Sequence, residues 1–197
     1  ADAMALAHRL SMHKPFYEAT GGGVTLSGGE PLLQAAVAET ILRALKSEGI
    51  HTCVETCGQV PWETFGKVAP WVDLFYYDVK VMDRARHREH CGADLGLILE
   101  NLHRLAARGA RIEIRCPMIP GVNTNPGHWR RVAALARGLP GVEAVHLLPY
   151  HPLGTGKTGA RTGLRFPEVE QTMFDDAKSI LESEGAGVRV KWPKSAW

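Results

Sequence analysis

Two side chains of opposite charge stand two positions apart near the middle of the sequence. Asp78 and Lys80 flank Val79 at the end of an apolar run, and side chains two positions apart on a β-strand leave the same face. A carboxylate beside an ammonium group can hold a zwitterion, because each charge then meets its opposite. The pair fits an ordinary ion pair at a strand end equally well, and these residues alone leave both interpretations open.

A second candidate site is the segment Gly28-Gly29-Glu30, which follows the apolar run 24–27. Glycine carries no Cβ, so two glycines let another group approach the backbone N–H and C=O groups closely. Glu30 adds a carboxylate, and Pro31 suits the first turn of a following helix. A plain turn between a strand and a helix is the competing interpretation.

Arg115 and His151 supply further polar groups beside apolar runs. Arg115 lies within an otherwise apolar segment, where an unpaired charge is costly, so it needs an anionic ligand or the nearby Glu113 as its partner. His151 stands between Tyr150 and Pro152, which favours a loop that faces a ligand over a core position. Together these groups favour a small zwitterionic ligand that carries a further polar part.

The elements that must position these residues alternate along the chain. Short β-rich runs are expected at residues 24–27, 51–55, 74–79, 111–118, 144–150 and 188–192. Segments with helical period lie between most of them, and this alternation predicts a parallel sheet with helices packed outside it. In such folds ligands bind just beyond the carboxyl ends of the strands. We therefore expect the candidate residues at one rim of a single domain.

Four helices are predicted from apolar spacing and from end signals. The first covers residues 32–48 and the second 94–108, each followed by a glycine. A third begins at Asn125 and Pro126, as N-cap and first-turn proline. A fourth begins at Pro167 and ends at Gly185. The apolar positions expected along the first and fourth helices are Leu33, Val37, Ile41 and Leu45, and Val169, Met173, Ala177 and Ile180.

The composition narrows the function classes. The chain has 197 residues and a net charge of +2, which indicates neither nucleic acid nor an anionic membrane as partner. No stretch is apolar for long enough to span a membrane. The four cysteines are scattered, which suits a reducing cytoplasm. Residues 154–158 lack the upstream glycine of a phosphate-binding loop, and His87 and His90 lack further metal ligands at zinc spacing.

Five segments occur in the order found in one enzyme family. Residues 21–32 (GGGVTLSGGEPL), 55–58 (ETCG), 77–80 (YDVK), 119–123 (IPGVN) and 147–154 (LLPYHPLG) resemble those of the glycyl radical enzyme activating enzymes. These are radical S-adenosylmethionine proteins, and the pyruvate formate-lyase activating enzyme is their best-known member. The likeness extends from about Tyr17 to the C-terminus.

The resemblance implies a partial, open, TIM-like (β/α)6 barrel that holds S-adenosylmethionine at the carboxyl ends of its strands. Its motifs imply that the cofactor-binding residues are Gly28, Gly29, Glu30, Asp78, Val79, Lys80, Arg115 and His151. In this likeness Gly28, Gly29 and Glu30 line the methionine amino group. Asp78 and Lys80 take the amino and carboxylate groups. A monovalent-cation site beside the cofactor is also implied, with the ligands Glu55, Thr56, Asp78 and the Tyr76 carbonyl.

The family's reaction is the reductive cleavage of S-adenosylmethionine to methionine and a 5′-deoxyadenosyl radical. That radical removes a hydrogen atom from a backbone glycine of a large partner enzyme. The resemblance therefore implies a cytoplasmic oxidoreductase with a [4Fe-4S] cluster. It also implies two partners, a glycyl radical enzyme and an electron donor such as flavodoxin or ferredoxin.

The sequence departs from the family's pattern in one respect. The family binds its cluster through thiolates spaced Cys-x3-Cys-x2-Cys, and no cysteines of this sequence have that spacing. Nothing before Gly21 resembles the first barrel strand and its cluster loop, and residues 1–14 are expected to form the helix that follows them. We therefore expect residues 1–197 to be a fragment of a longer activase, inactive by itself, with strand 24–27 at a sheet edge.

Two other interpretations stay open. A non-catalytic ligand-binding or scaffold domain without a cluster would also lack the cysteine motif. A barrel lyase or isomerase would use Lys80 as a base or as a Schiff-base amine, with Asp78 beside it.

Overall fold

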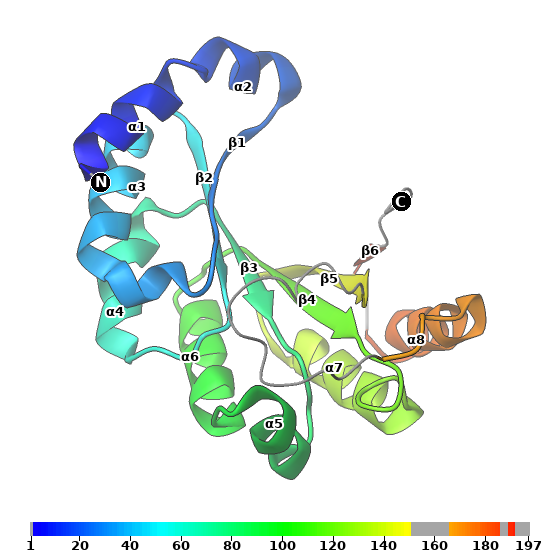
Figure 1. The fold of residues 1–197 in the computed structure, drawn as a ribbon. Helices are drawn as coiled ribbons and strands as arrows, with labels where there is room; N and C mark the ends of the chain where they lie inside the picture. The colour runs from blue at the N-terminus through cyan, green and yellow to red at the C-terminus, as the bar shows by residue number, and fades with distance from the viewer. Residues whose placement is uncertain (1, 151–165, 186–188, 192–197) are drawn as a thin grey trace. The chain divides into compact units, whose positions relative to one another are not determined.

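The computed structural model describes residues 2–150, 166–185 and 189–191. Helices and strands alternate within them, as Figure 1 shows. The strands follow one another in sequence order across one sheet: β1 (Gly23–Leu26), β2 (His51–Thr56), β3 (Leu74–Asp78), β4 (Ile112–Met118), β5 (Val142–Pro149) and β6 (Arg189–Lys191). The pairs β1–β2, β2–β3 and β5–β6 are parallel, which confirms the predicted α/β class. Among the described residues β1 begins this order, so its expected place at a sheet edge is confirmed.

The first two helices precede β1, and the other helices lie between successive strands along the chain. The helices are α1 (Ala3–Ser11), α2 (Lys14–Thr20), α3 (Ala35–Ser47), α4 (Trp62–Val68), α5 (Arg84–Cys91), α6 (Leu95–Ala107), α7 (Pro126–Gly138) and α8 (Gln171–Glu184), with 3-10 turns η1 (Pro31–Gln34) and η2 (Ala69–Trp71). Of the helices that the structure describes, none is both long and apolar enough to cross a membrane. The chain forms two compact units, Ala1–Asp78 with Gly96–Glu113, and Val79–Leu95 with Ile114–Trp197.

In the first unit, α1 packs against α3. The expected N-terminal helix is confirmed as α1, and the Asp2 side chain caps it by accepting the Met4 N–H at 3.0 Å. Apolar residues of α1, β1 and α3 meet in one cluster, whose buried members are Ala7, Val24, Ile41, Leu45 and Ile50. This cluster fixes β1 from the helix side, and with β1 the loop that follows it.

The start of the predicted 32–48 helix is wrong in its detail. Residues Pro31–Gln34 form the 3-10 turn η1, and the α-helix begins only at Ala35. A 3-10 turn has three residues per turn rather than 3.6, so it rotates the apolar positions before the helix. As a result Leu32 is buried, whereas Leu33 is 74% exposed. Val37, in the first turn of α3, is 41% exposed although it shares the helical period of Ile41 and Leu45. The later predicted positions Ile41 and Leu45 are buried as the period requires.

A side chain of α6 hydrogen-bonds the loop that follows β2. The Asn101 amide donates to the carbonyls of Gly58 and Val60, at 2.9 and 2.8 Å, and is fully buried. The Tyr77 hydroxyl donates to the Ile98 carbonyl at 2.7 Å. Gly58 has a φ of 75°, and a Cβ there would lie 1.8 Å from the Tyr77 hydroxyl oxygen, so only glycine fits.

In the second unit, α7 packs against α8 and β5. Asn125 is the N-cap of α7 as predicted, with its side chain accepting the His128 N–H at 3.0 Å. The fourth predicted helix starts later than Pro167, because Glu170 keeps an extended backbone and α8 begins at Gln171. Its buried face is therefore Phe174, Ala177 and Leu181, while the predicted Met173 and Ile180 are only half-buried.

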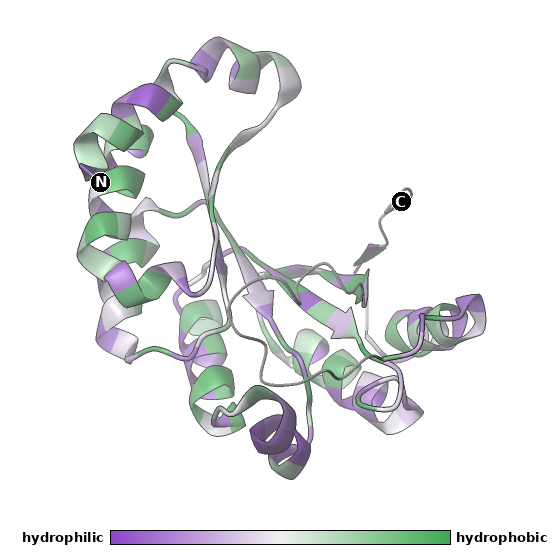
Figure 2. Ribbon diagram, in the orientation of Figure 1, coloured by the Kyte–Doolittle hydropathy of each residue, from purple (hydrophilic) through white to green (hydrophobic). Residues whose placement is uncertain are grey.

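The helix α5 is hydrophilic along most of its length (Figure 2).

A histidine is buried in the first turn of α7. His128 is 2% exposed, and its Nδ1 accepts the Met82 N–H at 3.3 Å. Burial, with a smaller effect of the Arg131 charge, lowers the pKa of His128 to about 4. The imidazole is therefore neutral at physiological pH, so one ring nitrogen carries no proton, and the bond from the Met82 N–H assigns that nitrogen as Nδ1.

This burial predicts a pH dependence of stability. The unfolded chain binds a proton at His128 below the ordinary pKa of 6.5, whereas the folded chain does so only near pH 4. The unfolding free energy should therefore fall as the pH drops from about 6.5 to about 4, by roughly 3 kcal/mol from this group. Urea denaturation at stepped pH measures it. His128→Asn has no titrating ring, so its curve should be flatter by that amount, and identical curves for both proteins would contradict the prediction.

Candidate functional site

The loop after β1 presents bare backbone to open space. Gly28 has a φ of 140°, in the left-handed region that favours glycine. A Cβ built on Gly28 or on Gly29 would meet no heavy atom of the described chain within 4 Å beyond its immediate neighbours. Close packing within the chain therefore does not require these two glycines. Their backbone groups are accessible, as a ligand-binding loop needs.

Glu30 ties this loop to the end of β2. Its carboxylate caps η1 by accepting the Leu32 N–H at 3.1 Å. It also accepts the Thr56 hydroxyl, at 2.9 and 3.0 Å from its two oxygens, and the Cys57 N–H at 2.8 Å. The side chain thus holds three donors of its own chain. The contact with a ligand amino group that the resemblance implies for Glu30 stays a prediction.

Glu55 and Thr56, two of the residues implied for a cation site, have different partners. The Ser27 hydroxyl donates to Glu55 Oε2 at 2.5 Å. The Thr56 hydroxyl donates to Glu30 and accepts the Gly58 N–H at 3.0 Å. Successive side chains of a strand leave opposite faces, so these two side chains do not point to one ion. The cation site stays a prediction.

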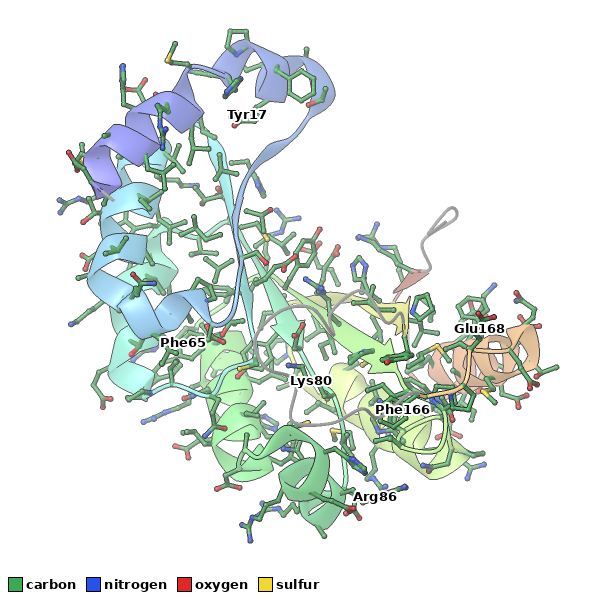
Figure 3. All side chains as sticks on the ribbon, in the orientation of Figure 1. Tyr17, Phe65, Lys80, Arg86, Phe166 and Glu168 are labelled. Carbon is green, nitrogen blue, oxygen red and sulfur yellow. The ribbon has the colours of Figure 1, made fainter. Side chains whose placement is uncertain are left out.

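Burial alternates along the segment that carries Asp78 and Lys80. Tyr77 and Val79 are buried, whereas Asp78 and Lys80 are half-buried. That the two charged side chains leave the same face stays a prediction from their spacing. The Val79 N–H donates to the Arg115 carbonyl at 2.9 Å. Figure 3 labels Lys80, which lies just beyond the end of β3.

The other two predicted ligand residues are Arg115 and His151. Arg115 is half-buried on β4, and Glu113 on the same strand is 4% exposed. The choice between Glu113 and an anionic ligand as the partner of Arg115 stays a prediction. His151 lies outside the described residues. The chain just before it is placed next to β4, because the Tyr150 N–H donates to the Met118 carbonyl at 3.1 Å.

Two buried asparagines that hold these loops were not predicted. Asn101 supports the loop after β2, and Asn123 supports Lys80 by donating to its carbonyl at 2.6 Å. Asn101 stands on the apolar face of α6 between Ile98 and Leu105, both of which are buried. An amide on such a face must find partners there, and this was the signal available in the sequence.

The cysteines do not fit an iron–sulfur cluster. Cluster ligands are thiolates, yet Cys53 and Cys116 are buried, and burial raises the pKa of Cys53 to about 11. Burial also raises the pKa of Cys91. Among the described residues no three His, Cys, Asp or Glu side chains are grouped as metal ligands. His87, set aside as a metal ligand from the sequence, is buried with Nδ1 3.0 Å from the Ala93 carbonyl oxygen.

The role of Thr56 can be tested with an isosteric change. Thr56→Val keeps the shape of this 3% exposed side chain but removes its hydroxyl. Glu30 then loses one donor and the Gly58 N–H loses its acceptor, so we expect the free energy of unfolding to fall by about 2 kcal/mol. Urea denaturation measures the change. Thr56→Ser keeps the hydroxyl and should lose clearly less, and equal losses in the two variants would contradict the assignment.

The chain is similar in sequence to several curated proteins. Among curated proteins, the chain is 44% identical to the choline trimethylamine-lyase activating enzyme of Oleidesulfovibrio alaskensis over 167 residues, 83% of this chain and 54% of that protein. It is 39% identical to the trans-4-hydroxy-L-proline dehydratase activating enzyme of Clostridioides difficile over 94% of this chain and 63% of that protein. The chain thus spans about half to two thirds of the length of these relatives.

A solved structure and a family model give the same assignment. A crystallised domain of a pyruvate-formate lyase-activating enzyme from Bacteroides vulgatus superposes with a TM-score of 0.75 at 29% identity, covering 87% of this chain and 99% of that domain. The relatives confirm the resemblance to the activating enzymes of glycyl radical enzymes. The Radical SAM superfamily model matches residues 15–128, more than half of the sequence. The chain therefore belongs to the Radical SAM superfamily.

Proposed function

We propose that this chain is the S-adenosylmethionine-binding part of a glycyl radical enzyme activating enzyme. One observation carries the proposal: the open backbone at Gly28 and Gly29 lies in a chain whose curated relatives include several such activases. The complete protein would cleave S-adenosylmethionine with one electron and generate a glycyl radical on its partner. Because the cysteines present do not fit the cluster, residues 1–197 alone should bind the cofactor without cleaving it.

The proposed binding mode follows from charge. S-adenosylmethionine carries an α-ammonium group, an α-carboxylate and a sulfonium. Asp78 attracts the ammonium group, and Lys80 attracts the carboxylate. The backbone carbonyls of Gly28 and Gly29 accept further hydrogen bonds from the ammonium group, while Glu30 keeps their loop in place through Thr56 and Cys57.

The remaining assignments follow from the resemblance. Val79 supplies backbone between the two charged residues, and Arg115 and His151 contact the carboxylate side or the nucleoside end. The electron donor would be a small redox protein of the flavodoxin or ferredoxin type, and the compartment would be the cytoplasm. The partner would be a glycyl radical enzyme, since the curated relatives named above are activating enzymes.

Calorimetric titration with S-adenosylmethionine tests the proposal. We expect measurable but weak binding by the wild-type chain, weakened about tenfold or more by Asp78→Ala or by Lys80→Ala, because each removes a charge-assisted hydrogen bond. Lys67→Ala, at an exposed position of α4, is the matched control and should bind as the wild type does. Unchanged affinity in both the Asp78 and Lys80 variants would refute the binding mode.

A second candidate, a ligand-binding or scaffold domain without a cluster, is favoured by the buried thiols of Cys53 and Cys116. The coding sequence upstream of the codon for Ala1 separates the two. The activase predicts an in-frame Cys-x3-Cys-x2-Cys motif there, because three thiolates are needed for the cluster. If no such motif precedes residue 1 in the same reading frame, the domain without a cluster is the correct function.

A further inference from the structure

The backbone on both sides of Lys80 is held by three hydrogen bonds within four residues. The Val79 N–H donates to the Arg115 carbonyl at 2.9 Å, the Lys80 carbonyl accepts from Asn123 Nδ2 at 2.6 Å, and the Met82 N–H donates to His128 Nδ1 at 3.3 Å. All of these residues belong to the second unit. The strand β3 ends at Asp78, so the last two bonds take over where the β-ladder stops.

Asn123 uses both ends of its amide for this purpose. It is fully buried, and its Nδ2 donates to the Pro117 carbonyl at 2.6 Å as well as to Lys80. Its Oδ1 accepts the Ile119 N–H at 2.7 Å. Two donors and one acceptor at these places require a side-chain amide of this length. Asn123 thereby joins the segment after β3 to the end of β4.

His128 holds the backbone after Lys80, at Met82, and its own position is set by contacts within α7. Its own N–H donates to the Asn125 side chain at the start of α7, and its ring lies edge-on to Trp129 with centroids 4.6 Å apart. The Met82 amide can only donate, so Nδ1 accepts and any proton of the neutral ring is on Nε2. The ring also lines a cavity of about 200 Å³ with Arg86 and Arg131, so a smaller side chain there costs packing too.

We propose that Asn123 and His128 are positioning residues for Lys80. This inference rests on the proposed function, in which the Lys80 ammonium group binds the carboxylate of S-adenosylmethionine. Lysine has four rotatable side-chain bonds, so the place of its ammonium group depends on a backbone that does not move. Asn123 fixes the Lys80 carbonyl, and His128 fixes the Met82 N–H. The two residues thereby determine the position of the Lys80 Cα, from which the side chain extends, without contacting the ligand.

The first test asks whether His128 holds the backbone. His128→Asn places an oxygen near the position of Nδ1 and keeps the acceptor, whereas His128→Leu removes it. Amide hydrogen exchange of the free chain should therefore be faster at Met82 in His128→Leu and unchanged there in His128→Asn. Equal exchange at Met82 in His128→Leu and the wild type would overturn the inference whether or not the chain binds S-adenosylmethionine.

The second test is a double-mutant cycle with calorimetric affinity for S-adenosylmethionine as readout. Asn123→Asp keeps the acceptor oxygen of the side chain and loses its two donors. We expect His128→Leu and Asn123→Asp each to weaken binding about fivefold. His128→Asn should bind within twofold of the wild type. In a Lys80→Ala background neither change should weaken binding further, because both act through Lys80. Ala133→Gly in the interior of α7 is the control for a loss of helix stability and should leave affinity unchanged.

The outcomes separate the inference from the function on which it rests. A wild-type chain that does not bind S-adenosylmethionine refutes the proposed function, and the exchange at Met82 then decides the backbone role alone. A wild-type chain that binds, with His128→Leu and Asn123→Asp binding equally well, overturns the positioning role only. Equal weakening with and without the Lys80 side chain would show a general structural effect and would also overturn it.

Discussion

Where each parallel strand ends, its backbone N–H and C=O groups lose their ladder partners, and the candidate site depends on what replaces them. Buried backbone groups cannot be left unpaired without a cost of about 1–3 kcal/mol each. Here the replacements are side chains from neighbouring elements. Glu30 accepts the Cys57 N–H after β2, Asn101 serves the Gly58 and Val60 carbonyls, and Asn123 serves Lys80 after β3. Within each unit, polar side chains therefore supply the hydrogen bonds that the strands no longer provide.

This constraint explains why similar residues have different roles. Glu30 and Asp78 are both carboxylates at strand ends, but the described contacts of Glu30 are with donors of its own chain. Asp78 stands two positions before Lys80 and is half-buried, and in the proposed binding mode it attracts the ammonium group of the ligand. The cysteines differ in the same manner, since burial keeps Cys53 as a thiol while Cys57 is half-buried beside the Glu30 carboxylate.

Local patterns in the sequence predicted the sheet and most helices, because periodicity and caps are local properties. The runs at 24–27 and 51–55 agree with β1 and β2 within a residue at either end, and Asn125 caps α7. The face of the turn at Leu33 was wrong because a 3-10 start is decided by packing. Partners far apart in sequence, such as Asn123 with Lys80 or Glu30 with Thr56, could not be read from spacing. The family resemblance named the ligand residues, but not the side chains that support them.

The contact between Gly58 and Tyr77 limits how this protein can change. A Cβ at position 58 would collide with the Tyr77 hydroxyl, and removing that hydroxyl would remove its hydrogen bond to the Ile98 carbonyl. Neither residue can therefore be replaced alone without loss. In evolutionary terms the two positions form a coupled pair, which should vary together in homologous sequences or not vary at all. The glycine of the ETCG segment is then required by its own scaffold, independently of the chemistry proposed at the rim.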